Sequence, residues 1–81
     1  MQELEQIGAT VQSLASIGRG CPDLLVGYRG INFLLEIKDG KKSPSRRRLT
    51  GDQVDWHAAW RGRLYVVESA IQALEIVCGK N

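Results

Sequence analysis

Two carboxylates, Asp23 and Glu36, lie at equal distances from a predicted tight turn at Arg29-Gly30. If Leu24 to Tyr28 and Ile31 to Lys38 pair as antiparallel strands, Asp23 lies five residues before Tyr28 and Glu36 five residues after Ile31. Residues placed in this way are direct cross-strand neighbours. Like charges in that position repel and weaken a hairpin, whereas a bound cation makes the same pair favourable. The spacing therefore predicts a cation site.

The alternation of side chains along this hairpin supports the same register, because a slip of one residue would exchange its two faces. One face collects largely apolar side chains, namely Leu24, Val26, Tyr28, Ile31, Phe33, Leu35 and Ile37. On the other face the polar groups gather at the end away from the turn, where Lys38 projects beside Glu36 and Asp23. We take this acid, acid and lysine cluster as the candidate active site.

Magnesium suits this cluster, because it prefers one or two carboxylates together with water and substrate phosphate oxygens. Asp23 and Glu36 supply the carboxylates, and the carbonyl of Ile37 can add a third protein oxygen while the Ile37 side chain stays in the core. The metal would polarise a scissile phosphate and activate a water, and Lys38 would orient that water or stabilise the developing charge. Taken singly, Glu-x-Lys is usually a surface ion pair and Gly-x-Pro-Asp is usually a turn. Only their conjunction on one face indicates a metal site.

A basic segment follows the hairpin. From Lys38 to Arg48 the local charge is +5, although the whole chain carries only +2. Such a segment is either a solvated, flexible loop or a surface that attracts a polyanion by its phosphates. The candidate nucleic-acid contacts are Lys41, Lys42, Arg46, Arg47 and Arg48.

The remaining pattern predicts the elements that must position the cluster. Glycines, capping residues and short apolar runs divide the chain into alternating helices and strands. We expect a helix ending near Ile7, a strand from Thr10 to Leu14, the hairpin, a loop from Asp39 to Arg48, a helix from Thr50 to about Arg61, a strand from Leu64 to Glu68, and a helix from Ala70 to Val77 capped by Ser69. The order α-β-β-β-α-β-α predicts a mixed α/β sheet flanked by helices.

The 81 residues are enough for one domain, spanning 1–81, with a modest core, so a homo-oligomer is expected. The chain contains no apolar run of membrane-spanning length, and its first residues lead us to expect no secretory signal. Its two cysteines and single histidine show no disulfide framework and no paired metal spacing. We therefore expect a soluble protein of a reducing cytoplasm.

Three segments together resemble the signature of the VRR-NUC family (virus-type replication-repair nucleases) in the PD-(D/E)XK nuclease superfamily. These segments are Gly20 to Leu24, Glu36 to Lys38, and Leu49 to Gln53 followed by Trp56. The likeness spans about Gly8 to Val77 and is greatest to small stand-alone, virus-type members, which have a similar basic loop and Trp-His-x-x-Trp helix. It implies a restriction-endonuclease-like fold and a homodimeric endonuclease that depends on Mg²⁺ or Mn²⁺. The implied substrate is branched, flapped or four-way junction DNA, in a bacterial or phage-infected cell.

Residue by residue, the resemblance assigns metal binding to Asp23 and Glu36, the catalytic lysine to Lys38, and the motif glutamine to Gln53. Gln53 also occupies the capping-box position after Thr50, and we expect that one side chain cannot fill both roles completely. Family members usually supply one more glutamate from the first helix. Here Glu3 or Glu5 either substitutes for it or is an ordinary exposed helix residue.

Three further side chains on the predicted Thr50 to Arg61 helix are weaker candidates. His57, one turn after Gln53, either faces the site or lies on the helix surface. Trp56 and Trp60 either stack on unpaired bases or pack in a core or a dimer interface. An endonuclease is the leading function. The alternatives are a nucleic-acid-binding module whose short first helix leaves catalysis weak or absent, and a structural or dimerisation domain.

Overall fold

A mixed sheet of four strands forms the centre of residues 1–79, which are the residues that the computed structural model describes. The predicted order of helices and strands is confirmed, and no predicted element end moves by more than two residues. The elements are α1 (Gln2–Gln6), β1 (Thr10–Ser13), β2 (Leu24–Tyr28), β3 (Ile31–Ile37), a 3₁₀ turn (Pro44–Arg47), α2 (Gly51–Ala59), β4 (Leu64–Val67) and α3 (Ala70–Val77). The segment predicted as a loop from Asp39 to Arg48 thus contains one turn of 3₁₀ helix.

The β2–β3 hairpin adopts the predicted register. The strands follow the spatial order β1-β2-β3-β4, with β1, β2 and β3 antiparallel and β4 parallel to β3. Tyr28 pairs with Ile31, and Leu24 pairs with Leu35. Arg29 and Gly30 both have positive φ, at 51° and 80°, which is the backbone that a two-residue turn needs to match the twist of its strands.

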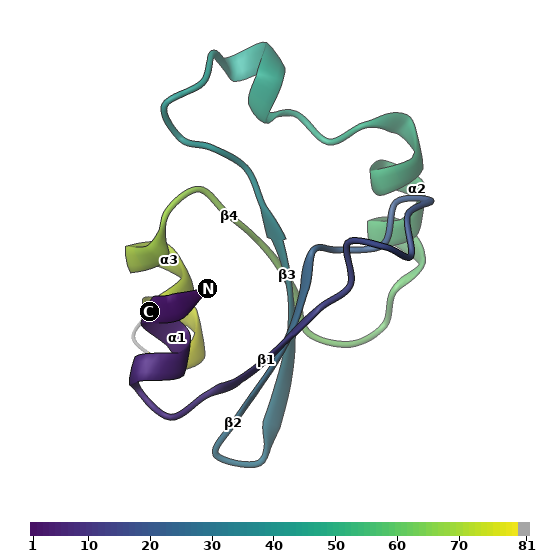
Figure 1. The fold of residues 1–81 in the computed structure, drawn as a ribbon. Helices are drawn as coiled ribbons and strands as arrows, with labels where there is room; N and C mark the ends of the chain where they lie inside the picture. The colour runs from purple at the N-terminus through teal and green to yellow at the C-terminus, as the bar shows by residue number, and fades with distance from the viewer. Residues whose placement is uncertain (80–81) are drawn as a thin grey trace.

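Helices α1 and α3 lie side by side on one face of the sheet and enclose the core (Figure 1). Leu4, Val26, Leu35 and Val67 are fully buried there. The predicted apolar face of the hairpin is therefore correct in its middle but wrong at one position named for the core. The Ile37 side chain is 38% exposed, because it is the last residue of β3 and the core helices do not cover it.

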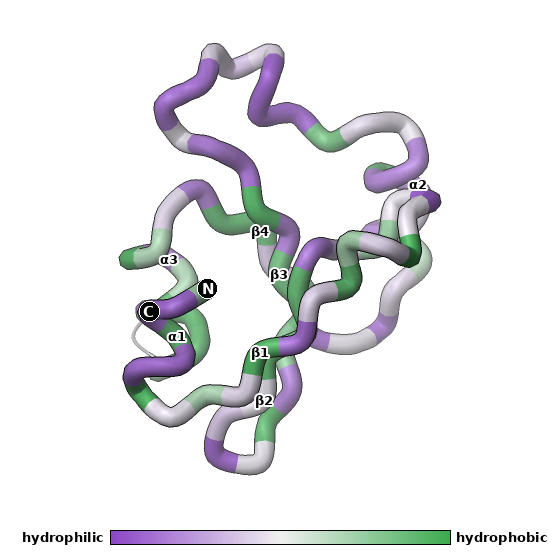
Figure 2. Tube along the Cα trace, viewed as in Figure 1, coloured by the Kyte–Doolittle hydropathy of each residue, from purple (hydrophilic) through white to green (hydrophobic). Residues whose placement is uncertain are grey.

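Helix α2 lies on the opposite side of the sheet from α1 and α3 (Figure 1). The segment that joins β3 to α2 projects away from the body of the molecule and is strongly hydrophilic (Figure 2). Arg47 anchors this segment, because its Nη1 donates to both carboxylate oxygens of Glu68 at 3.1 and 3.2 Å. None of the helices within residues 1–79 has the length and apolar character needed to cross a bilayer.

Candidate active site

Asp23 is delivered to the site by a glycine that packs against the start of α2. Gly20 has φ +85°, and a Cβ at this position would collide with the backbone carbonyl of Asp52. Pro22 is buried and fixes its own φ, so the chain between Gly20 and Asp23 has little freedom. The Gly-Cys-Pro-Asp segment therefore sets the distance between the start of β2 and helix α2.

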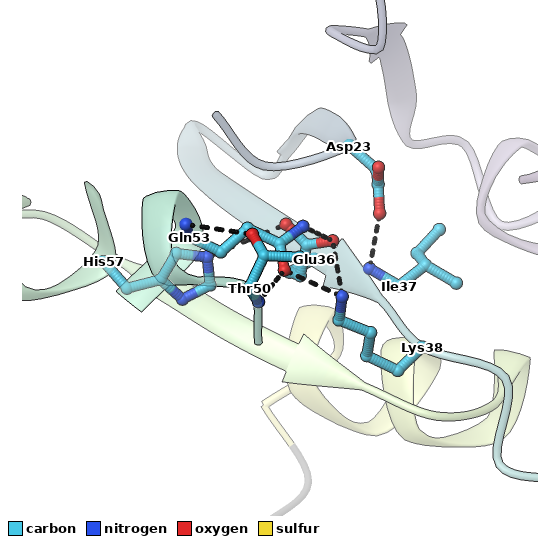
Figure 3. A network of polar contacts seen from close by, with 7 residues as sticks. All are labelled: Asp23, Glu36, Ile37, Lys38, Thr50, Gln53 and His57. Atoms are coloured by element: carbon cyan, nitrogen blue, oxygen red, sulfur yellow. Dashed lines mark hydrogen bonds and ion pairs between the residues drawn. The ribbon is translucent and has the colours of Figure 1, made fainter. Parts of the chain in front are cut away.

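The Asp23 carboxylate is held by the backbone of β3. Asp23 donates its own N–H to the carbonyl of Leu35 at 3.0 Å, and its Oδ2 accepts from the N–H of Ile37 at 2.7 Å (Figure 3). In a β-strand the N–H and C=O of one residue leave the same edge. The carbonyl of Ile37 therefore faces the β2 side of β3, where Asp23 lies, as the prediction for a third oxygen ligand requires.

Glu36 is the buried centre of the cluster. Its side chain is 2% exposed, and its Oε2 accepts from Nε2 of Gln53 at 3.1 Å, with the Lys38 Nζ 3.8 Å away. The second oxygen, Oε1, is buried without a hydrogen-bond partner and lies 3.7 Å from Nε2 of His57. One half of this carboxylate is thus bonded to protein groups, and the other half is left without a donor.

Gln53 fills both of the roles that we expected to compete, so that expectation was wrong. Its Oε1 accepts from the backbone N–H of Thr50 at 2.9 Å and from Nζ of Lys38 at 2.8 Å, while its Nε2 donates to Glu36. Both donors to Oε1 can only donate, so the orientation of the amide follows from its neighbours. A primary amide has an acceptor end and a donor end, and here they serve the helix cap, the lysine and the buried acid together (Figure 3).

The electrostatics of the cluster are dominated by the buried acid Glu36. Burial raises the pKa of Glu36 to about 7, assisted by the neighbouring Asp23 carboxylate, and Lys38 offsets part of this shift. Burial and the Lys38 charge lower the pKa of His57, so its imidazole is neutral near pH 7. Positive charge near Asp23 and Glu36 would restore the ionised form of Glu36.

His57 belongs to the cluster, although only a weak sequence signal pointed to it. Its side chain is 12% exposed and faces Glu36, and its Nε2 is buried without a hydrogen-bond partner. The available signal was its position one helical turn after Gln53, which places both side chains on one face of α2. That spacing could not separate a residue facing the site from one facing solvent, because it does not show which face of α2 meets the sheet.

The five cations of the basic loop differ in their exposure to solvent. Lys41, Lys42, Arg46 and Arg48 are exposed, as a surface for a polyanion requires. Arg47 is half-buried and paired with Glu68, so its first role is to anchor the loop to the end of β4. Of the five predicted contacts, the four exposed ones remain candidates for phosphate binding.

The first helix brings no carboxylate to the cluster. Glu3 and Glu5 are exposed on α1, which packs with α3 on the other face of the sheet from Gln53 and Glu36 (Figure 1). Of the two readings left open for these residues, the structure supports ordinary exposed glutamates. The protein oxygens available to a cation are therefore those of Asp23, Glu36 and the Ile37 carbonyl.

This donor set fits a hard divalent cation. Within residues 1–79 no three Asp, Glu, His or Cys side chains converge as a ready-made metal site. Two carboxylates and a carbonyl still match magnesium, which normally takes most of its remaining ligands from water and phosphate. Comparison of the chain with protein-family models, with curated protein sequences and with solved structures found no match. The function is therefore argued from the residues and geometry of the cluster.

Proposed function

We propose that this protein is a divalent-metal-dependent endonuclease that hydrolyses phosphodiester bonds in structured DNA. The observation that carries the proposal is the contact of Glu36 and Lys38 with each other and with Gln53, next to Asp23, which accepts from the N–H of Ile37. A simple surface ion pair would need neither the burial of Glu36 nor a glutamine from another element. The resemblance to the VRR-NUC signature supports the same function and the PD-(D/E)XK fold.

Asp23, Glu36 and the Ile37 carbonyl would hold the metal. A divalent ion bound there supplies a polarised phosphate and a water of lowered pKa. The structure offers a reason for the site to take a cation, because Glu36 has a pKa near 7 and a buried oxygen without a donor. Asp23 is already oriented by the N–H of Ile37, so little rearrangement is needed on binding.

Lys38 is the residue of this chain that acts on the reacting group. Its Nζ is fixed by Gln53 at 2.8 Å, and its side chain is only 13% exposed, so its charge is partly shielded from water. As water attacks phosphorus and the bond to the leaving ester oxygen breaks, negative charge grows on the phosphoryl oxygens. The Lys38 ammonium stabilises that charge by hydrogen bonds that strengthen in the transition state.

The exposed cations of the basic loop bind the DNA backbone in this proposal. Lys41, Lys42, Arg46 and Arg48 follow directly from the strand that carries Glu36 and Lys38. Contacts of this kind are independent of base sequence and weaken as salt concentration rises. The resemblance adds a homodimer and branched DNA, including four-way junctions, to the proposal.

A cleavage assay on a panel of branched, flapped and fully paired DNAs tests the function. We expect cutting only with Mg²⁺ or Mn²⁺, and a fall in rate of at least about 10²-fold in Asp23→Asn and in Lys38→Met, the size typical for loss of one transition-state contact. Asp55→Asn changes an exposed acid of α2 outside the cluster and should cut at the wild-type rate. Cutting without metal, or equal cutting by Asp23→Asn, would contradict the mechanism.

A nucleic-acid-binding module is the second candidate. The observation that favours it is the position of Glu3 and Glu5 on the far face of the sheet, which leaves the cluster with two carboxylates. This alternative predicts salt-sensitive binding without cutting in any metal, unchanged in Asp23→Asn and Lys38→Met. A purely structural domain would instead show no loss of DNA affinity when Arg46 and Arg48 are neutralised.

A further inference from the structure

A groove of about 350 Å³ lies beside Trp60, on the face of the sheet that carries the site cluster. Its lining residues are Leu25, Asn32, Leu34, Trp60, Gly62 and Arg63. Asn32, Leu34 and Glu36 are every second residue of β3, so their side chains project from the same face of the sheet. From Asn32 to Glu36 the strand rises about 14 Å. The groove and the site therefore lie on the same face of β3, with the buried Leu34 between Asn32 and Glu36.

One wall of the groove is an exposed tryptophan held in a defined position. Trp60 is 46% exposed and stacks on Trp56 with ring centroids 4.9 Å apart and planes 17° apart. Gly62 permits this arrangement, because a Cβ there would lie 2.8 Å from Nε1 of Trp60. A large indole that is ordered and still exposed is characteristic of a recognition surface.

The chemistry of the groove matches one kind of ligand. Trp60 offers a flat aromatic wall, Leu25 and Leu34 are apolar, and the exposed Asn32 offers an amide. Arg63 adds a positive charge at the groove, and its Cζ lies 5.8 Å from the centroid of the Phe33 ring. A nucleobase is a flat ring with hydrogen-bonding edges joined to a negatively charged backbone. The residues that line this groove include a cation and no acid, so its charge also favours an anionic chain.

We propose that the groove beside Trp60 binds an unpaired nucleobase of the DNA strand cut at the Asp23–Glu36 cluster. The inference rests on the proposed function and narrows its substrate to DNA with a single-stranded segment beside the cut. At about 3.4 Å for each stacked nucleotide, a separation of about 14 Å places the bound base within about four nucleotides of the scissile phosphate. Fully base-paired DNA cannot present such a base without being opened.

Binding measurements without metal test the groove separately from cutting. Asp23→Asn is titrated in EDTA with a flapped DNA and with a fully paired duplex of the same length, and 2-aminopurine is placed at successive flap positions. We expect quenching at one or two positions within about four nucleotides of the branch. Adding Trp60→Leu should weaken flap binding about 10-fold to 100-fold and leave duplex binding unchanged, because stacking acts on the unpaired base.

Matched variants make the result specific. Trp60→Phe keeps an aromatic face and should restore flap binding to within a few-fold of the parent, while Val54→Ala, an exposed apolar residue elsewhere on α2, should have no effect. Should Trp60→Leu fail to fold, Arg63→Gln and the quenching pattern of the parent protein decide the question. The mononucleotide dAMP should compete poorly, since it lacks the neighbouring phosphates.

Four results would overturn the inference. The first two are quenching that does not depend on position, and an equal loss of flap and duplex affinity in Trp60→Leu. The other two are competition by dAMP as strong as by the flap, and a change in the sedimentation mass of DNA-free Trp60→Leu, which would show that a second copy binds this surface.

Failure of the nuclease proposal and failure of the groove proposal give different results. Quenching without metal-dependent cutting retains the groove and removes the nuclease. Cutting of paired and flapped DNA at equal rates, without quenching, retains the nuclease and removes the groove.

Discussion

Strand β3 contributes a buried side chain to each face of the sheet, and the two side chains differ in their effect on stability. On the α1 and α3 face, Leu35 is fully buried among apolar side chains. One residue later and on the other face, Glu36 is almost as buried but is an acid with an unpartnered oxygen. Apolar burial stabilises the fold, whereas burying an acid costs free energy unless a partner compensates for it. The first face therefore stabilises the protein, whereas the burial of Glu36 on the second face costs free energy that the proposed cation would offset.

Removing buried side-chain volume from each face should give the largest difference in the free energy of unfolding. Leu35→Ala should reduce the free energy of unfolding by about 2–5 kcal/mol, because it leaves a cavity in the closed core. Leu34→Ala should cost less, because Leu34, which is 7% exposed, lies outside the apolar core cluster and borders a groove that water can enter. Urea denaturation of both variants measures the difference. Equal losses would mean that the two faces are packed alike.

Two glycines of one loop give the next largest effect. Gly20→Ala should destabilise the protein by more than Gly18→Ala, since both have positive φ but only Gly20 contacts the backbone of Asp52. A left-handed backbone costs an alanine about 1–2 kcal/mol, so Gly18→Ala measures the strain alone. Gly20→Ala should also lower the cleavage rate by moving Asp23 relative to α2. Thermal unfolding and cleavage by the two variants test this, and identical behaviour would show that the contact does not position Asp23.

The pH dependence of stability measures how the protein environment changes the protonation of Glu36. The pKa of Glu36 is raised from 4.5 to about 7, so the folded protein holds a proton that the unfolded chain releases. The associated stability is complete below pH 4.5 and is lost as the pH rises through about 7. Glu36→Gln cannot lose this proton, so its stability relative to wild type should rise across that window and then level off.

Chemical unfolding of both proteins at several pH values measures that difference, and the comparison with Glu36→Gln removes most of the contribution of His57. Adding Mg²⁺ or Mn²⁺ at pH 8 should stabilise the wild type and leave Glu36→Gln nearly unchanged, because the ion takes the place of the proton on Glu36. A relative stability that does not change with pH would contradict the assigned burial of this acid.

The smallest expected change in stability separates the two roles of Gln53. Thr50→Ala removes the hydroxyl that accepts from the Gln53 N–H and should cost about 1 kcal/mol with little effect on cutting. Gln53→Ala has a similar effect on the helix but also frees Lys38 and removes a donor from Glu36. Its cleavage rate should fall well below that of Thr50→Ala. Equal rates would reduce Gln53 to a helix cap.

Much of the fold could be predicted because it depends on local signals. The hairpin register follows from side-chain alternation and from a turn that needs positive φ, and Ser69 caps α3 as predicted, accepting from the N–H of Gln72 at 3.1 Å. That register also brings Glu36 and Lys38 together at the end of the hairpin, while their chemical role stays a prediction. Arg47 could not be separated from its basic neighbours, because its partner Glu68 lies 21 residues further along the chain. His57 and the dual bonding of Gln53 depended on how α2 docks on the sheet, which no local pattern specifies.

The hydrogen bond from the Ile37 N–H to Asp23 links the alignment of strands β2 and β3 to the position of a candidate metal ligand. The strand pairing that aligns Leu24 with Leu35 also brings this acid to its donor, so a hairpin shifted by a single residue would turn Glu36 away from Gln53. Turnover of substrate would then report the fraction of molecules whose strands are correctly aligned. A refolding experiment followed by recovery of cleavage would give the rate at which β2 finds β3.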